Sequence, residues 1–373
     1  MSILVTGGAG YIGSHMVLAL ADAGEDVVVI DNLSTGFAWA VDPRAKLITG
    51  DIADQALIGA IIKSHGVEAI VHFAGSIVVP DSITDPLGYY LNNTVKSRAL
   101  VESAVTGGVR NFIFSSTAAV YGNPETQPVF ETARPQPISP YGTSKLMTEW
   151  MLRDSHLAYG LNYVALRYFN VAGADPKGRS GQSTPRATHL IKVACQTALG
   201  QRTSMDVFGT DYDTPDGTCL RDYIHVSDLI GAHVKALAHL RSGGESGIFN
   251  CGYGKGYSVL EVIAAVEKAH GAPINKVLGP RRAGDPAAIV AGAARVRDIL
   301  GWVPAHDDLD EIVTSALAWE QVGAGLSLPF AGVHIIDATK QFYRRAPLRA
   351  TRRSFALRPV LLPQPSPTPR AAN

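Results

Sequence analysis

At 373 residues the chain is long enough to bury a sizeable core and to form two lobes. Its 46% hydrophobic and 18% charged residues are typical of an ordinary globular enzyme. The formal net charge is zero, so overall charge points to neither nucleic acid nor a membrane surface as a partner.

The first half of the sequence alternates short β-branched apolar runs with longer helical patterns. Strands are expected at residues 3–5, 27–30, 47–49, 69–73 and 112–115, and helices at 11–23, 55–64, 87–107 and 141–158. Strands that are apolar throughout and separated by helices are typical of a parallel sheet covered on both faces. The predicted fold class is therefore α/β, with a doubly wound parallel sheet.

After residue 166 the pattern loosens, and stretches rich in Gly, Pro and Asp (173–185, 209–217 and 280–286) separate shorter helices. We expect a smaller α/β lobe whose loops grip a ligand and which is interleaved with the first lobe. The predicted division is 1–170, 171–322 and a tail at 323–373, with a last helix at 309–322.

The tail differs in composition from the rest of the chain. Residues 324–373 carry eight Lys or Arg and one acid, with five prolines after Ala356. We expect a largely disordered, solvated extension rather than a tether to an anionic surface.

The three cysteines are sparse and show no metal-ligand spacing, so reduced thiols and no metal site are expected. The first residues enter a strand without a charged leader, and no apolar run approaches about 18 residues. We therefore expect neither a signal peptide nor a membrane span, and a cytoplasmic location.

A glycine-rich loop follows the first expected strand. Residues 6–14 read Thr-Gly-Gly-Ala-Gly-Tyr-Ile-Gly-Ser; Gly8, Gly10 and Gly13 satisfy the dinucleotide-binding fingerprint, and Gly7, Gly10 and Gly13 its three-spaced variant. Glycines are needed because the turn is tight, the backbone approaches a pyrophosphate, and the helix packs closely on the strand. Since the loop opens the first helix, cofactor binding is favoured over an ordinary strand-to-helix turn.

Two acids follow later strands. Asp31 comes after the second strand, where a carboxylate can accept hydrogen bonds from an adenosine ribose. A carboxylate repels a 2′-phosphate, and the next arginine is Arg44, so Asp31 favours NAD over NADP. Asp51, after the third strand, is either a contact to the adenine edge or a capping residue.

A Tyr–Lys pair stands at the start of the helix at 141–158. Ser139 and Pro140 suit the helix start, and Tyr141 and Lys145 share one face. A lysine ammonium, the helix N-terminus and an oxidised nicotinamide each favour the phenolate, which makes Tyr141 a usable base near neutrality. Thr117, at the end of the fifth strand, can hydrogen-bond the same reacting hydroxyl.

Taken together, these motifs resemble the extended short-chain dehydrogenase/reductase family, and within it the UDP-glucose 4-epimerases. The resemblance runs from residue 3 to about residue 320. It is carried by residues 6–14, 31–32, 72–75, 115–122, 141–145, 167–170, 208–226 and 280–285, in that order.

The resemblance implies a Rossmann-like fold in which residues 1–170 bind NAD and residues 171–322 bind a UDP sugar. Tyr141 is expected to take the proton of the hydroxyl on carbon 4 while a hydride passes to NAD. The 4-keto sugar then turns over and is reduced on its opposite face, interconverting UDP-glucose and UDP-galactose for galactose metabolism or polysaccharide supply. Members are often homodimers through two helices, here 87–107 and 141–158.

The resemblance implies a catalytic or binding role for many residues of this chain, by their position in the family's motifs. The catalytic residues are expected to be Tyr141, Lys145 and Thr117. The NAD contacts are expected to be Gly7, Gly10, Tyr11, Ile12, Gly13, Asp31, Asn32, Asp51, Ile52, Phe73, Ala74, Gly75, Asn92, Ser115, Tyr141, Lys145 and Phe169. The UDP-sugar contacts are expected to be Thr117, Asn170, His189, Leu190, Phe208, Arg221, Tyr223, Arg282, Asp285 and Ile289.

Three positions depart from the family pattern. Ile77 stands where many members have a Lys, His189 where an Asn often stands, and Ile289 where hexose-specific members have a Tyr. A smaller side chain at residue 289 admits an N-acetyl group, so a 4-epimerase of UDP-N-acetylhexosamines or UDP-pentoses is an alternative.

Two further readings are less favoured. A nucleotide-sugar 4,6-dehydratase needs an acid and a base where this chain has Ala118 and Ala119. A non-catalytic dinucleotide-binding regulator is disfavoured because both Tyr141 and Lys145 are present.

Overall fold

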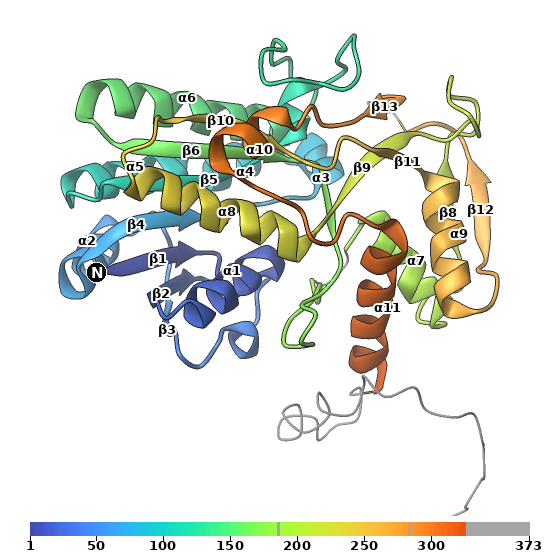
Figure 1. Cartoon of the computed structure of the whole chain (residues 1–373), viewed down its shortest axis with the longest axis horizontal. Helices are drawn as coiled ribbons and strands as arrows, with labels where there is room; N and C mark the ends of the chain where they lie inside the picture. Colours follow the sequence, from blue (N-terminus) through green and yellow to red (C-terminus); the bar gives the residue numbers. More distant parts are fainter. Residues whose placement is uncertain (185–186, 283–284, 326–373) are drawn as a thin grey trace, which may run out of the picture. The chain divides into compact units, whose positions relative to one another are not determined.

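The computed structural model describes residues 1–184, 187–282 and 285–325 (Figure 1). The chain divides into two units, residues 1–331 and 332–373, and all described residues belong to the first. The expectation of disorder in the tail therefore falls almost wholly outside the described residues.

A seven-stranded parallel sheet forms the centre of this unit, in the order β10-β6-β5-β4-β1-β2-β3. Every neighbouring pair in the sheet is parallel. Its strands are β1 (Ser2–Thr6), β2 (Asp26–Asp31), β3 (Lys46–Thr49), β4 (Val67–His72), β5 (Asn111–Thr117), β6 (Asn162–Tyr168) and β10 (Gly247–Cys251). The predicted doubly wound α/β fold is confirmed.

Helices cover both faces of the sheet because alternate residues of each buried strand point to opposite sides. On β1, Ile3 and Val5 belong to one core with α1 (Tyr11–Asp22) and α8 (Val226–Arg241). Leu4 belongs to the other core, with α2 (Gln55–His65), α5 (Lys96–Thr106) and α6 (Pro140–Tyr159). Figure 1 shows α1 and α8 lying across one face.

The sequence pattern missed the far edge of the sheet. After β6 the chain leaves the central sheet. It comes back through α8 and forms β10, which pairs with β6 so that Phe249 lies opposite Leu166. Residues 226–251 therefore pack in the first lobe although they follow residue 170.

One predicted helix is wrong in detail. Instead of a continuous helix over 87–107, the chain forms α4 (Pro86–Tyr89), a π-helical stretch η2 (Tyr90–Val95) and then α5. A short helix α3 (Val79–Thr84) precedes them. A π-helical stretch inserts an extra residue into the turn and occurs often at functional sites.

Smaller elements form a second lobe, on the right in Figure 1. One sheet joins β11 (Gly256–Ser258), β9 (Leu220–His225) and β13 (Ala288–Ile289), with β7 (Asn170–Ala172) also pairing β9; β8 (Met205–Phe208) pairs with β12 (Lys276–Gly279). The helices α7 (Leu190–Ala198), α9 (Val259–His270) and α11 (Leu309–Gly325) pack around them. The helix α10 (Ala294–Leu300) packs with the first lobe, and η1 (Ala38–Ala40) and η3 (Ala118–Tyr121) are single 3₁₀ turns.

The last helix, α11, runs three residues beyond its expected end at 322. Cys195, Cys219 and Cys251 are buried and unpaired. Among the described residues, no helix combines the length and apolar character needed to cross a membrane.

Candidate active site

The glycine loop connects β1 to α1 with very little space. Gly7 has φ +69°, and a β-carbon there would lie 2.6 Å from the amide nitrogen of Ala74. A β-carbon at Gly13 would lie 2.1 Å from the carbonyl oxygen of Gly7. Both positions therefore require glycine, one for its backbone angle and one for the close packing of helix on loop.

The start of α1 offers free amides. Gly10 is the N-cap and supplies no side-chain cap, and the first bond within the helix runs from Ser14 N to Gly10 O at 2.9 Å. The amides of Tyr11, Ile12 and Gly13 consequently have no acceptor inside the helix. Free amides at a helix N-terminus suit a pyrophosphate, so the loop fits a dinucleotide.

Asp31 lies at the carboxyl end of β2, directly beside this loop. Its carboxylate accepts hydrogen bonds from Ala9 N at 3.0 Å and from Leu33 N at 2.8 Å. Each oxygen keeps a lone pair for another donor. These hydrogen bonds hold Asp31 next to the glycine loop, which is where a carboxylate that accepts from ribose hydroxyls has to lie.

A hollow beside the loop includes residues that sequence reasoning missed. It is lined by Ala9, Gly10, Tyr11, Ser14, Thr35, Phe37, Trp39, Ala40, Gly181, Ser183 and Thr184. The segment after Asp31 reaches the hollow because Phe37 N donates to Ala9 O at 2.9 Å. No motif marks these residues, since only the path of two loops brings them together.

Other expected cofactor residues lie along neighbouring strand ends. Asp51 forms an ion pair of 2.5 Å with Lys96, and Asn92 in the π-helical stretch donates to Ser76 Oγ at 2.9 Å. Asn32 accepts from Ser34 N at 3.1 Å, and Ile52 is buried. Phe73 packs against the ring of His233, Ala74 N donates to Thr6 Oγ1 at 3.3 Å, and Gly75 lies near the Lys145 ammonium.

The three expected catalytic residues come together at the end of β5. Ser139 caps α6 by accepting from Gly142 N at 3.2 Å, which places Tyr141 in the first turn. The Tyr141 hydroxyl hydrogen-bonds the Thr117 side chain. Lys145, one turn further, donates to the carbonyl oxygen of Ser115 at 2.9 Å.

Burial sets the electrostatics of this pair. It lowers the pKa of Lys145 to about 8, against an opposing effect of the Glu149 carboxylate. It also raises the pKa of the Tyr141 phenol, an effect that the hydrogen bond with Thr117 opposes. Within the described residues no hydrogen bond joins Lys145 to Tyr141, and the lowering of the phenol pKa by the lysine charge, the helix N-terminus and an oxidised nicotinamide stays a prediction.

A buried network supports these residues and was not predicted. Glu149 accepts from Ser116 Oγ at 2.5 Å and forms an ion pair of 2.6 Å with Arg167. The Arg167 guanidinium lies over the ring of Tyr121 at 4.8 Å. The network links α6, β5 and β6, and its only sequence signal is that Glu149 continues the spacing of Tyr141 and Lys145.

Beside the network, the hydroxyls of Tyr168 and Ser115 share a hydrogen bond. Phe169 follows Tyr168 and packs, partly buried, against a cluster that includes Tyr121, Leu146 and Ile289. Ile289 belongs to the same buried cluster as Ala118, the residue after Thr117, and its role in shaping the sugar pocket stays a prediction.

Charged residues gather in the second lobe, on β9 and just before β13. Asp285 lies 3.7 Å from Arg221 and 3.9 Å from Arg282, and the Arg282 guanidinium covers the ring of Phe208 at 4.2 Å. Asn170 donates to Asp222 O at 3.2 Å, beside this cluster on β9. An arginine pair next to an aromatic ring suits a nucleoside diphosphate.

The remaining expected substrate residues lie elsewhere on the lobe. His189 hydrogen-bonds Gln182 at 2.8 Å, and burial lowers its pKa. Leu190 begins α7, and Tyr223 is buried in the core of the lobe. Ile77, which replaces the family lysine, is 43% exposed.

Comparison with known proteins agrees with this geometry. The model of the NAD dependent epimerase/dehydratase family matches residues 3–252. A UDP-glucose 4-epimerase of Azospirillum brasilense is 58% identical over 319 residues, covering 86% of this chain and 92% of that protein.

Solved structures are similar over nearly the same length. The crystal structure of UDP-glucose 4-epimerase from Bifidobacterium longum in complex with NAD⁺ and UDP gives a TM-score of 0.82 at 38% identity, covering 87% of this chain and 99% of that one. The UDP-Glc/GlcNAc 4-epimerase of Campylobacter jejuni gives 0.76 at 46% identity, covering 86% and 99%.

Proposed function

The chain belongs to the NAD dependent epimerase/dehydratase family, and we propose that it interconverts UDP-glucose and UDP-galactose by epimerisation at carbon 4 of the hexose. One observation carries the proposal. Tyr141, Thr117 and Lys145 meet at the end of β5, in the same row of strand ends as the glycine loop and Asp31. The 58% identity with a UDP-glucose 4-epimerase supports the choice of substrate.

In this proposal each of the two lobes binds one ligand. Residues 1–170 hold NAD through the first-turn amides of α1 and the carboxylate of Asp31, together with the other expected cofactor contacts. Residues 171–322 hold the UDP sugar, with Arg221 and Arg282 facing its diphosphate. Bound NAD supplies a hydride acceptor, and then a hydride donor, for carbon 4 of the sugar.

The protein's own residues move the proton. Tyr141 takes the proton from the hydroxyl on carbon 4 and later returns it, while Thr117 hydrogen-bonds the same oxygen. Because burial raises the pKa of Tyr141, nearby positive charge must lower it, and the sources are the Lys145 ammonium, the N-terminus of α6 and an oxidised nicotinamide. The sugar must turn between the two steps so that both faces of carbon 4 reach the same groups.

The rival reactions are separated by specific residues. A 4,6-dehydratase needs carboxylates after the active-site Thr, but Ala118 and Ala119 occupy η3 there. Epimerisation of UDP-N-acetylhexosamines has more support, because Ile289 leaves more room than a Tyr and a similar epimerase is named for both UDP-Glc and UDP-GlcNAc. A UDP-pentose is a further candidate.

We also propose that the enzyme acts as a cytoplasmic homodimer. Apolar side chains are exposed on the α4–η2 segment, where Leu87 is 78% exposed and Leu91 and Val95 follow at four-residue spacing. On α6, Trp150 is 47% exposed. Exposed apolar side chains on neighbouring helices favour burial against a second copy.

The test is product identification without added cofactor. The purified protein is incubated separately with UDP-galactose and UDP-N-acetylgalactosamine, and the products are separated by chromatography. The proposal predicts UDP-glucose from the first. Conversion of the second as well would show that Ile289 leaves the pocket open, whereas conversion of neither, even with NAD added, would rule the proposal out.

A further inference from the structure

A loop from the second lobe crosses to the start of α1. Its first residue, Gly173, accepts a hydrogen bond from the Tyr11 hydroxyl at 2.7 Å. Further along, the hydroxyls of Ser180 and Ser14 lie 2.7 Å apart and are buried. Two side chains in the first turns of the glycine-loop helix therefore fix the path of this loop.

The next residues of the loop form one wall of the hollow beside the glycine loop. Gly181, Ser183 and Thr184 line it from one side, with Gly10 and Tyr11 among the residues of the other. The hollow adjoins the first turn of α1, whose free amides suit the phosphates of a dinucleotide. We call residues 181–184 the cofactor wall.

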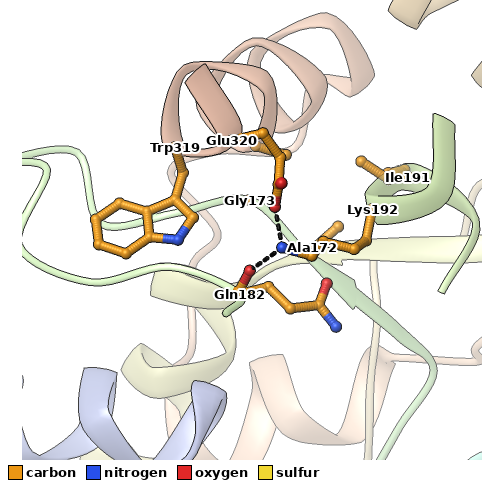
Figure 2. Close-up of a pocket in the computed structure, with 8 residues that line it drawn as sticks. Ala172, Gly173, Gln182, Ile191, Lys192, Trp319 and Glu320 are labelled. Atoms are coloured by element: carbon orange, nitrogen blue, oxygen red, sulfur yellow. Dashed lines mark hydrogen bonds and ion pairs between the residues drawn. The ribbon is translucent and has the colours of Figure 1, made fainter. Parts of the chain in front are cut away.

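The cofactor wall is supported from behind by α7 and α11, as Figure 2 shows. The Lys192 ammonium lies between the carbonyl oxygen of Gln182 and the carboxylate of Glu320. Trp319 donates from Nε1 to Ser183 Oγ at 3.2 Å, and a β-carbon at Gly181 would lie 2.4 Å from its indole ring.

Three consecutive wall residues thus lie against two side chains, Gly181 and Ser183 against Trp319 and Gln182 against Lys192, and Glu320 holds Lys192 in turn. The supporting ion pair is buried, with Lys192 8% and Glu320 7% exposed. Such a pair adds little stability compared with apolar residues of the same size, but removing one partner leaves an uncompensated charge. Its geometric effect here is to hold a carbonyl of the wall at a fixed place between two helices.

We propose that Lys192, Trp319 and Glu320 are positioning residues that hold the cofactor wall against bound NAD and thereby set how long the cofactor stays bound. The inference rests on the proposed function in requiring NAD on the glycine loop. It does not depend on which sugar is converted. A loosened wall would withdraw Gly181, Ser183 and Thr184 from the hollow that they line with Gly10 and Tyr11.

The matched variants are Glu320→Gln and Asp310→Asn. Both neutralise an acid on α11 that pairs with a lysine, but the Asp310–Lys268 pair is exposed and joins α9. The measurement is the exchange rate of bound NAD for isotope-labelled NAD in the holoenzyme, with thermal unfolding of each variant as a check of its fold. We expect Glu320→Gln to exchange NAD about tenfold faster, in the usual range of coupling between sites, and Asp310→Asn to match the parent.

Trp319→Phe gives a second test if Glu320→Gln does not fold. It keeps an aromatic ring against Gly181 and removes the donor to Ser183, and should also speed NAD exchange. Turnover with saturating NAD should stay close to that of the parent in both variants.

Folded variants that exchange NAD at the parent rate would overturn the inference while leaving the proposed function intact. Faster exchange in Asp310→Asn as well would also overturn it, because α11 would then act without the wall contacts. A parent protein that binds no NAD would overturn both proposals.

Discussion

The ammonium of Lys145 donates to the carbonyl oxygen of Ser115 at 2.9 Å, and this bond ties the helix of the Tyr–Lys pair to the strand that ends in Thr117. The same ammonium is buried, and burial lowers the pKa of Lys145 from its ordinary 10.5 to about 8. The site therefore holds a charge that the fold itself disfavours.

Lys145→Met should abolish turnover yet stabilise the nucleotide-free protein at pH 7. Between pH 8 and 10.5 the unfolded chain binds a proton that the folded chain has lost, so the parent gains stability as pH rises there. Below pH 8 the buried ammonium lowers the free energy of unfolding most. Its removal should therefore raise the free energy of unfolding by on the order of 1–3 kcal/mol, minus the contribution of the lost hydrogen bond to Ser115. Urea unfolding at pH 7 and pH 10 measures the difference in free energy of unfolding between the variant and the parent, which should be smaller at pH 10. An equal or larger difference at pH 10 would contradict this.

Tyr141→Phe should lower kcat by about 10²–10⁴-fold, the usual contribution of a general base, while the fold and the bound NAD remain. Thr117→Val removes the hydrogen-bond partner of the reacting oxygen and the cap on Ala119 N but leaves the base in place, so its loss of kcat should be smaller. Turnover of UDP-galactose and the NAD content of each purified variant provide the measurement. Turnover of Tyr141→Phe at the parent rate would remove Tyr141 from the mechanism.

Gly13→Ala should destabilise the glycine loop, because its β-carbon would lie 2.1 Å from the backbone oxygen of Gly7. We expect a loss of about 1–3 kcal/mol or more, with reduced NAD retention. Gly59→Ala in α2 is the control, since nothing lies within 4 Å of its β-carbon. That change should raise the free energy of unfolding by about 0.5–1 kcal/mol. A comparable decrease at both positions would refute the steric argument.

Glu149→Gln should cost about 3 kcal/mol of unfolding free energy, because it leaves the Arg167 guanidinium buried without a countercharge. Asp154→Asn on the same helix removes an exposed partner of Arg153 and should change stability by less than about 0.5 kcal/mol. Urea unfolding of the two variants compares them directly. Equal effects would mean that the buried network does not hold α6 to β5 and β6.

The parts of the site that the sequence predicted well depend on local pattern. Buried strands alternate with helices, so their carboxyl ends fall on one edge of the sheet, and Thr117 and Tyr141 meet there. The glycine loop was recognisable because nearby backbone atoms leave no room for a β-carbon, as the contacts of Gly7 and Gly13 show.

The parts that the sequence did not predict depend on contacts between distant segments. Nothing local marks residues 247–251 as the edge strand, because its place follows from pairing with β6. The π-helical stretch at 90–95 looks like ordinary helix in its periodicity. The Glu149–Arg167 pair and the Trp319 contact with Ser183 join residues that are 18 and 136 positions apart.

The most direct test of the central claim follows a label on carbon 4. UDP-galactose carrying deuterium at that carbon is incubated with the purified protein in ordinary water, and the product is examined by mass spectrometry and NMR. Transient oxidation and return of the same hydride predict UDP-glucose that keeps its deuterium at carbon 4. Loss of the label to water, or no UDP-glucose even with NAD added, would contradict the account.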